Sequence, residues 1–295
     1  MPEPIMKKVK GNGIEINLAV WEGAGKPILC IHGITANCRC WDTLAKALAP
    51  EYHVIAMDLR GRGQSDKPSR GYALAYHLQD INCLLDDLGL DRAVIMGHSL
   101  GAFIGLAFAA EYPDRVDRLI LVDGGGDLSK DQIEKVFVGI KPALDRLGQV
   151  FSSAEAYLEK MSAAPYIQPW SAVTETYYRY EIEAVAGGVR TNITPAHIKE
   201  EAENIKKVDC APYYPRVKCD VLILRAPNGL LSQDDILLPA EVIDRMTREI
   251  PHAGRFDVEG MNHYGIVFQP HAARDEVIRE FLKGDPRGIF IHGQR

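Results

Sequence analysis

Apolar residues follow two patterns along the chain, and each pattern predicts a different kind of strand. Residues 14–20 alternate with a period of two after a turn at Gly11-Asn12-Gly13, which predicts an antiparallel pair at the edge of a sheet. Short continuous apolar runs then occur at 28–31, 54–57, 93–96, 119–122 and 221–224. Because strands that are buried on both faces show such runs, they predict a parallel sheet covered by helices.

Helical periodicity occupies the segments between these runs. Between residues 72 and 90, leucine and isoleucine recur on one helical face, and Gly89 is expected to end that helix. Residues 102–110 are apolar almost all round, as expected for a central buried helix. A last helix is expected at 270–282, followed by a frayed tail at 284–288.

The alternation of strands and helices stops between about Asp127 and Arg216 and resumes at Val221. The intervening residues have helix-like patterning and several prolines. We therefore expect an α/β core formed by residues 1–126 and 216–295, and a helical cap, or lid, formed by residues 127–215 over the carboxyl edge of the sheet. The cap is rich in aromatic residues, and most of them are expected to pack against one another. Any that line a pocket would favour an apolar or aromatic substrate.

The segment from Gly97 to Gly101, with Ser99 at its centre, directly follows the apolar run 93–96. A serine between a strand and a helix is typical of a nucleophile elbow, in which the hydroxyl projects from a strained turn. The residues two before and two after the serine must be nearly free of side chain, and both are glycine. The amino end of the following helix also directs N–H groups towards a developing anion. Ser99 is therefore the candidate nucleophile.

His263 is the candidate general base. It follows a strand-like run at 256–260 and precedes the last helix, and the pKa of histidine lies close to the operating pH. His252 precedes that strand and would lie at the wrong edge of the sheet. Two backbone N–H groups are expected to form the oxyanion hole, one from Leu100 and one from Ile34 after Gly33.

Four motifs together resemble the α/β-hydrolase superfamily: His32-Gly33, the stretch from Asp58 to Asp66, the elbow around Ser99, and Asn262-His263. The resemblance covers essentially the whole chain. It implies an α/β-hydrolase fold, which has an eight-stranded, mostly parallel sheet with helices on both faces and a helical cap inserted after the sixth strand. It also implies the chain order serine, acid, histidine, and it makes residues 58–66 a structural loop near the site.

The acid departs from the pattern that the resemblance implies. Its usual position is a short turn after the strand 221–224, yet residues 225–229 contain no carboxylate. Asp235 matches the family's spacing from acid to proline, with Pro239 following, so we expect Asp235 to be the acid with an insertion ahead of it. Asp123, at the end of the sixth strand, is the alternative, because some members of the superfamily carry the acid there. The acid would fix the tautomer of His263 and stabilise its imidazolium form.

Composition and charge narrow the possible partners. The 295 residues are 46% hydrophobic and 25% charged, and the net charge is −6. Such a balance is ordinary for a soluble enzyme and argues against nucleic acid or an anionic membrane as a partner. The six cysteines form no Cys-x-x-Cys pair, which favours a reducing compartment. Neither a signal peptide nor an apolar run of about 18 residues is evident, so we expect a cytoplasmic protein.

Taken together, these features predict a serine hydrolase of the carboxylesterase type that acts on a small-molecule ester, apolar or aromatic, through an acyl-serine intermediate. Neither a metal nor an organic cofactor is needed. Serine at the elbow disfavours dehalogenase and epoxide-hydrolase chemistry, which use aspartate there in this superfamily. A carbon–carbon bond hydrolase or lactonase with the same triad, and a small-molecule receptor on the same fold, remain alternatives. The oligomeric state, monomer or dimer, stays open.

Overall fold

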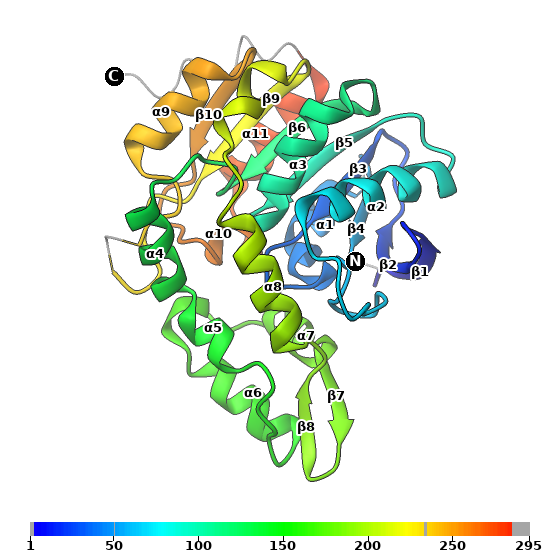
Figure 1. Cartoon of the computed structure of the whole chain (residues 1–295), viewed down its shortest axis with the longest axis vertical. Helices are drawn as coiled ribbons and strands as arrows, with labels where there is room; N and C mark the ends of the chain where they lie inside the picture. Colours follow the sequence, from blue (N-terminus) through cyan, green and yellow to red (C-terminus); the bar gives the residue numbers. More distant parts are fainter. Residues whose placement is uncertain (1–2, 50, 233–234, 285–295) are drawn as a thin grey trace.

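An eight-stranded sheet runs through the centre of the computed structural model (Figure 1), which describes residues 3–49, 51–232 and 235–284. The strand order is β1-β2-β4-β3-β5-β6-β9-β10, and all neighbours pair in parallel except β1 with β2 and β2 with β4. The strands are β1 (Ile5–Lys10), β2 (Glu15–Trp21), β3 (Pro27–Ile31), β4 (His53–Met57), β5 (Ala93–His98), β6 (Val116–Val122), β9 (Asp220–Arg225) and β10 (Ala253–Asp257).

The predicted mostly parallel sheet with an antiparallel edge is confirmed. The last strand differs from its prediction, because β10 covers residues 253–257 and not 256–260. The N–H of Val258 donates to the carbonyl of Arg225, and the chain then turns at Gly260, which has a φ of 78°. Residues 285–288 of the predicted tail lie outside the described residues.

Two layers of core side chains cover the sheet. Along β5, Val94 and Met96 join the layer that contains α1 and α11, whereas Ile95 joins the layer that contains α2, α3 and α9. This alternation follows from the period of two along a strand. The helices of the core are α1 (Asp42–Leu48), α2 (Leu74–Asp87), α3 (Leu100–Glu111), α9 (Ala240–Glu249), α10 (Gly265–Phe268) and α11 (Ala272–Lys283). The helices predicted after Tyr72, after Ser99 and near the carboxyl terminus are therefore present.

Residues 127–215, here called the inserted segment, lie between β6 and β9, which pair directly with each other. They gather at one end of the sheet, in green in Figure 1. Their elements are α4 (Lys130–Gly139), α5 (Lys141–Asp145), α6 (Ala154–Ser162), α7 (Ala172–Tyr180), β7 (Ile182–Val185), β8 (Gly188–Thr191) and α8 (Pro195–Ile205). The antiparallel hairpin β7–β8 was not predicted; it turns at Gly187 and Gly188, which have φ angles of 89° and 144°.

Short 3-10 turns connect several elements: η1 (Cys38–Trp41), η2 (Pro113–Arg115), η3 (Pro165–Ile167) and η4 (Ala211–Arg216). Within the part of the chain that the structure describes, no helix is both long and apolar enough to cross a bilayer.

Candidate active site

Ser99 occupies a strained turn between β5 and α3, with φ 56° and ψ −119°. A side chain at Gly97 would collide with the carbonyl of Gly101, and one at Gly101 would collide with the carbonyl of Ile31. Both glycines are therefore required by the close backbone approach around the serine. A non-glycine residue persists in such a conformation only when the surrounding structure holds it there, and such strain is frequent at functional sites.

His263 pairs with Asp123. The distance between His263 Nδ1 and Asp123 Oδ2 is 2.7 Å, and both side chains are buried. The other carboxylate oxygen of Asp123 accepts a hydrogen bond of 3.0 Å from the N–H of Ala226. With Nδ1 held by the carboxylate, the proton-accepting nitrogen of a neutral His263 is Nε2. His263 and Ser99 line the same pocket, as a base and a nucleophile must.

Asp235, the expected acid, does not take this place. Its carboxylate accepts hydrogen bonds from the backbone N–H groups of Leu230, Leu231 and Ser232, at 2.6, 2.8 and 3.2 Å. The choice of Asp235 as the partner of His263 is therefore wrong, and the alternative, Asp123, is the residue in contact. The reason is local, because the Asp235 carboxylate lies within reach of backbone N–H groups three to five residues before it and binds them.

Sequence features near Asp123 could have favoured it. Asp123 directly follows β6, next to the strand that carries Ser99, and has a φ of 46°. Three glycines follow it. A side chain at Gly124 would lie 2.6 Å from the carbonyl oxygen of Ser99. An aspartate followed by glycines at the carboxyl end of a central strand therefore indicates a residue packed against the Ser99 turn.

The loop that carries His263 is held from two sides. The N–H of Asn228, in the turn where the acid was first expected, donates to the carbonyl of Met261 at 3.1 Å. His98 lies beneath His263, with 4.4 Å between the ring centroids, and its Nε2 lies 2.9 Å from the carbonyl oxygen of His263. Burial, together with the nearby His263, holds the pKa of His98 well below its ordinary value. His98 is therefore neutral at pH 7 and can donate from Nε2 to that carbonyl.

The loop formed by residues 32–36, here called the oxyanion loop after its expected role, passes directly beside Ser99. A side chain at Gly33 would lie 3.2 Å from the Cβ of Ser99. His32 orients the loop, because its Nδ1 lies 2.7 Å from the carbonyl of Gly33 and its Nε2 accepts from the N–H of Leu59 at 3.0 Å. Burial lowers the pKa of His32 to about 4, so the ring is neutral at pH 7. Ile34 and Leu100 line the same pocket as Ser99. Their backbone N–H groups therefore remain the candidate oxyanion hole.

Two pockets meet at Ser99, and both include Ile34, Val136 and Ile140. The first encloses about 710 Å³, including space at its open mouth, and extends between α4, the end of α8 and the core. Its lining is mostly apolar and includes Phe103, Phe137 and Leu237. Its charged residues are Lys206 and Asp127. The second encloses about 490 Å³ on the His263 side, with Tyr177, Tyr264 and Phe268 in its wall.

The aromatic residues of the inserted segment mostly pack on one another. Tyr178 contacts the rings of Tyr157, Trp170 and Tyr177, with centroid separations of 6.1, 5.5 and 4.9 Å. Tyr177 also reaches the second pocket and contacts Phe268. In the described ranges, no group of three or more His, Cys, Asp or Glu side chains is placed to hold a metal ion.

Comparison with known proteins adds to this geometry. Residues 26–270 match a family described as the alpha/beta hydrolase fold. The chain is 30% identical over 263 residues to a 2-(acetamidomethylene)succinate hydrolase of Mesorhizobium japonicum, which covers 88% of this chain and 89% of that protein. A crystal structure of E-2-(acetamidomethylene)succinate hydrolase superposes with a TM-score of 0.84 at 26% identity, covering 95% of this chain and 100% of that one.

A shorter match is closer in sequence. An uncharacterised protein of Mycobacterium tuberculosis is 46% identical over 109 residues, which are 37% of this chain. The aligned region spans about a third of that relative's length, 32%.

Proposed function

We propose, from the premise that this chain belongs to the alpha/beta hydrolase fold family, that it is a serine hydrolase that cleaves carboxylic esters through an acyl-serine intermediate. The observation that carries this proposal is the strained Ser99 in the lining of an apolar pocket, with the buried Asp123–His263 pair beside it. These are the parts that an acyl transfer to serine requires.

Each residue would have one role in the reaction. His263 takes the proton from the Ser99 hydroxyl as the oxygen attacks the ester carbonyl, and Asp123 holds the imidazolium that forms. The N–H groups of Ile34 and Leu100 stabilise the tetrahedral oxyanion. His263 then returns the proton to the leaving alcohol, and water, activated in the same way, releases the acid from the acyl-serine.

The two pockets favour a division of the substrate. The leaving group must lie on the side of the histidine that protonates it, which is the second pocket, with Tyr177 and Tyr264 in its wall. The acyl chain then occupies the larger apolar pocket between α4 and α8, which includes Phe103 and Phe137. The substrate class is therefore an ester of a medium-length apolar acid with a small or aromatic alcohol.

The inserted segment would act as a cap over this site, with residues 1–126 and 216–295 as the core. It provides Val136, Ile140 and Tyr177 to the pocket walls, so it excludes water from the reacting ester. The six cysteines are free, as a reducing compartment such as the cytoplasm would keep them.

Hydrolysis of p-nitrophenyl esters of graded acyl length by the wild type and by S99A tests the proposal. We expect turnover that rises from acetate to a medium chain length and is abolished by S99A. No turnover of any ester by the folded wild type would reject the esterase function.

A second substrate series separates the alternatives. The same panel includes lactones, carbon–carbon bond substrates of aromatic catabolism, and 2-(acetamidomethylene)succinate, the compound that appears in the name of the relative. Preference for the succinate would be unexpected here, because Lys206 is the one cation in the lining described for the large pocket, and its Nζ lies 4.3 Å from the ring centroid of Phe137. Tight ligand binding without turnover would instead favour a receptor.

A further inference from the structure

Three consecutive carbonyl groups of the oxyanion loop are each held by a buried side chain. The carbonyl of Gly33 lies 2.7 Å from His32 Nδ1. The carbonyl of Ile34 accepts from Arg62 Nε at 3.0 Å, and that of Thr35 accepts from an Arg146 guanidinium nitrogen, also at 3.0 Å. His32 thus holds the peptide that carries the Ile34 N–H, through the Gly33 carbonyl, and the two arginines hold the next two peptides of the loop.

Arg146 belongs to the inserted segment and is fixed there by Glu181. The pair is bidentate, with N–O distances of 2.8 and 2.9 Å, and the exposed fractions of the side chains are 2% and 0%. The hydroxyl of Tyr157 donates to the same carboxylate. Burial alone would lower the pKa of Arg146, but the charge of Glu181 holds it well above its ordinary value. Arg146 thus brings a permanent, rigidly oriented donor from the inserted segment to the carbonyl of Thr35.

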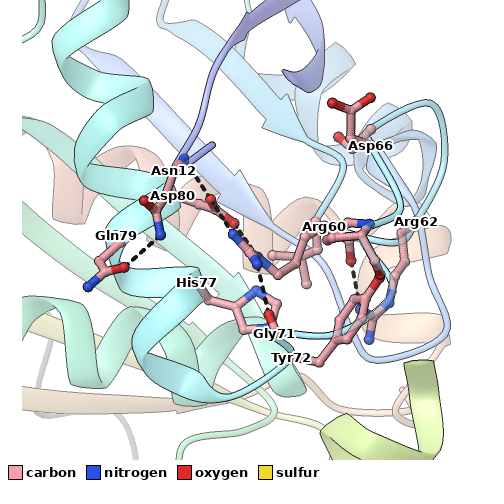
Figure 2. Close-up of polar contacts among 12 residues, drawn as sticks. Asn12, Arg60, Arg62, Asp66, Gly71, Tyr72, His77, Gln79 and Asp80 are labelled. Carbon is pink, nitrogen blue, oxygen red and sulfur yellow. Dashed lines mark hydrogen bonds and ion pairs between the residues drawn. The ribbon is translucent and has the colours of Figure 1, made fainter. Parts of the chain in front are cut away.

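Arg62 repeats this arrangement from the core side. It follows β4 in the structural loop 58–66, and its guanidinium forms an ion pair with Glu201, which lies on α8 of the inserted segment. His77 also contacts Glu201, at 2.6 Å. All three side chains are at least 98% buried. Figure 2 shows Arg62 beside the ring of Tyr72. Two consecutive carbonyls of the oxyanion loop are thus held by arginines whose carboxylate partners both come from the inserted segment.

We propose that the inserted segment completes the oxyanion hole: Glu181 and Glu201 hold Arg146 and Arg62 against the oxyanion loop, so the Ile34 N–H is in place only when the inserted segment is seated. These four residues are positioning residues and touch no substrate. The inference rests on the proposed function. It adds to the nucleophile, base and acid a further part of the site, the support of the oxyanion loop. It also explains why charged pairs are buried here, where apolar residues of similar size would cost less desolvation.

The test removes one pair without leaving a buried charge. R146M/E181L in a Y157F background replaces the pair by apolar side chains and leaves no tyrosine hydroxyl without its acceptor. Replacement of both partners by well-packed apolar residues is often neutral in stability. The carbonyl of Thr35 then loses its charged donor and keeps only the longer hydrogen bond, 3.4 Å, from the Tyr177 hydroxyl, while the fold is kept. Y157F alone is the reference for both kinetics and thermal unfolding.

A matched control exists in the core. Arg60 and Asp80 form a buried bidentate pair at 2.7 and 2.8 Å, and Arg60 donates to the carbonyl of Gly71 at 2.8 Å, as Figure 2 shows. The pair has the same chemistry as Arg146–Glu181 but holds a carbonyl away from the oxyanion loop. R60M/D80L therefore reports the cost of removing a buried ion pair in general.

We expect the Arg146–Glu181 variant to lower kcat by about 10- to 100-fold with KM changed less than about threefold, because small displacements of an oxyanion donor act on the transition state. Its affinity for an alkyl trifluoromethyl ketone, whose serine adduct carries an oxyanion, should fall by a similar factor. R60M/D80L should keep kcat within about threefold. If the double substitution does not yield folded protein, R146K replaces it, and we expect a several-fold loss of kcat because an ammonium cannot span Glu181 and Thr35 together.

An unchanged kcat and unchanged ketone affinity in the folded variant, or in R146K, would overturn the inference, as would an equal loss in R60M/D80L. The wild type in the same series tests the proposed function separately. If the wild type hydrolyses esters and the Arg146 variant has the same kcat, only the inference about the inserted segment is rejected. If the wild type hydrolyses no ester, the proposed function and this inference are both rejected.

Discussion

Replacement of Asp123 by asparagine should remove most of the activity, whereas the same replacement at Asp235 should not. In D123N the shape of the side chain is kept, but an amide replaces the carboxylate that lies 2.7 Å from His263 Nδ1. The amide oxygen is drawn to the N–H of Ala226, which donates to this side chain at 3.0 Å. The amide N–H₂ then faces His263 and favours the tautomer that carries its proton on Nε2, which cannot accept the serine proton.

The magnitude follows from this geometry. The pair is buried, with exposed fractions of 5% for the His263 side chain and 1% for that of Asp123, so solvent cannot replace the lost charge. The equivalent change of acid to amide in a serine protease lowers kcat by about 10⁴-fold, which corresponds to about 5.4 kcal/mol of transition-state stabilisation. We expect a loss of about 10³- to 10⁴-fold in kcat for D123N, with KM changed little.

D235N is the matched control. Asp235 accepts three backbone hydrogen bonds from residues 230–232, and an amide can replace only one of the two accepting oxygens. We expect D235N to lose about 1–3 kcal/mol of unfolding free energy while kcat stays within about threefold. Steady-state hydrolysis of p-nitrophenyl butyrate gives kcat and KM, and urea unfolding gives the free energy.

The reverse result would refute the reasoning. If D235N lost about 10³-fold in kcat while D123N kept wild-type kinetics, the acid would be Asp235, as first expected from the spacing to Pro239. If both variants lost activity and urea unfolding showed that both were unfolded under the assay conditions, neither kcat would report on catalysis. The experiment would then be repeated at a temperature where both remain folded.

Three further results are expected. Because His98 is neutral when folded, the free energy of unfolding falls as pH drops below about 6.5. In urea unfolding the wild type should lose more of it than H98Q between pH 7 and 5, by up to about 2 kcal/mol; equal losses would contradict this. G33A places a Cβ 3.2 Å from Ser99 Cβ and should lower kcat about tenfold with little change in melting temperature. I205W, in the large pocket, should lower kcat/KM for octanoate more than for acetate; a uniform loss would place the acyl chain elsewhere.

Local sequence signals located most of the fold. Continuous apolar runs predicted five of the parallel strands, and the alternating segment with its glycine turn predicted the antiparallel edge. The last strand was placed too late, because Val258 is apolar and buried although it stands just after β10. The hairpin β7–β8 was missed, since its strands have four residues each and show no buried run.

Ser99 and its two glycines were identifiable from the sequence because the elbow is a local device, in which backbone approach and residue size are set within five positions. The candidate base followed from its place after the last strand. The partner of that base could not be chosen in this way, because Asp123 and His263 are 140 positions apart. Their contact depends on how the segments that follow β6 and β10, the two neighbours of β9, meet at the carboxyl edge of the sheet.

The sequence by itself therefore determined the class of sheet, the candidate nucleophile and the position of the inserted segment, since each depends on the size and polarity of near neighbours. The tertiary structure alone decided which acid meets His263, which two pockets flank Ser99, and which arginines hold the oxyanion loop. The acid and the arginines are decided in this way because their buried charges come from distant segments of the chain. Each buried carboxylate pairs with a donor that only the folded chain brings close to it.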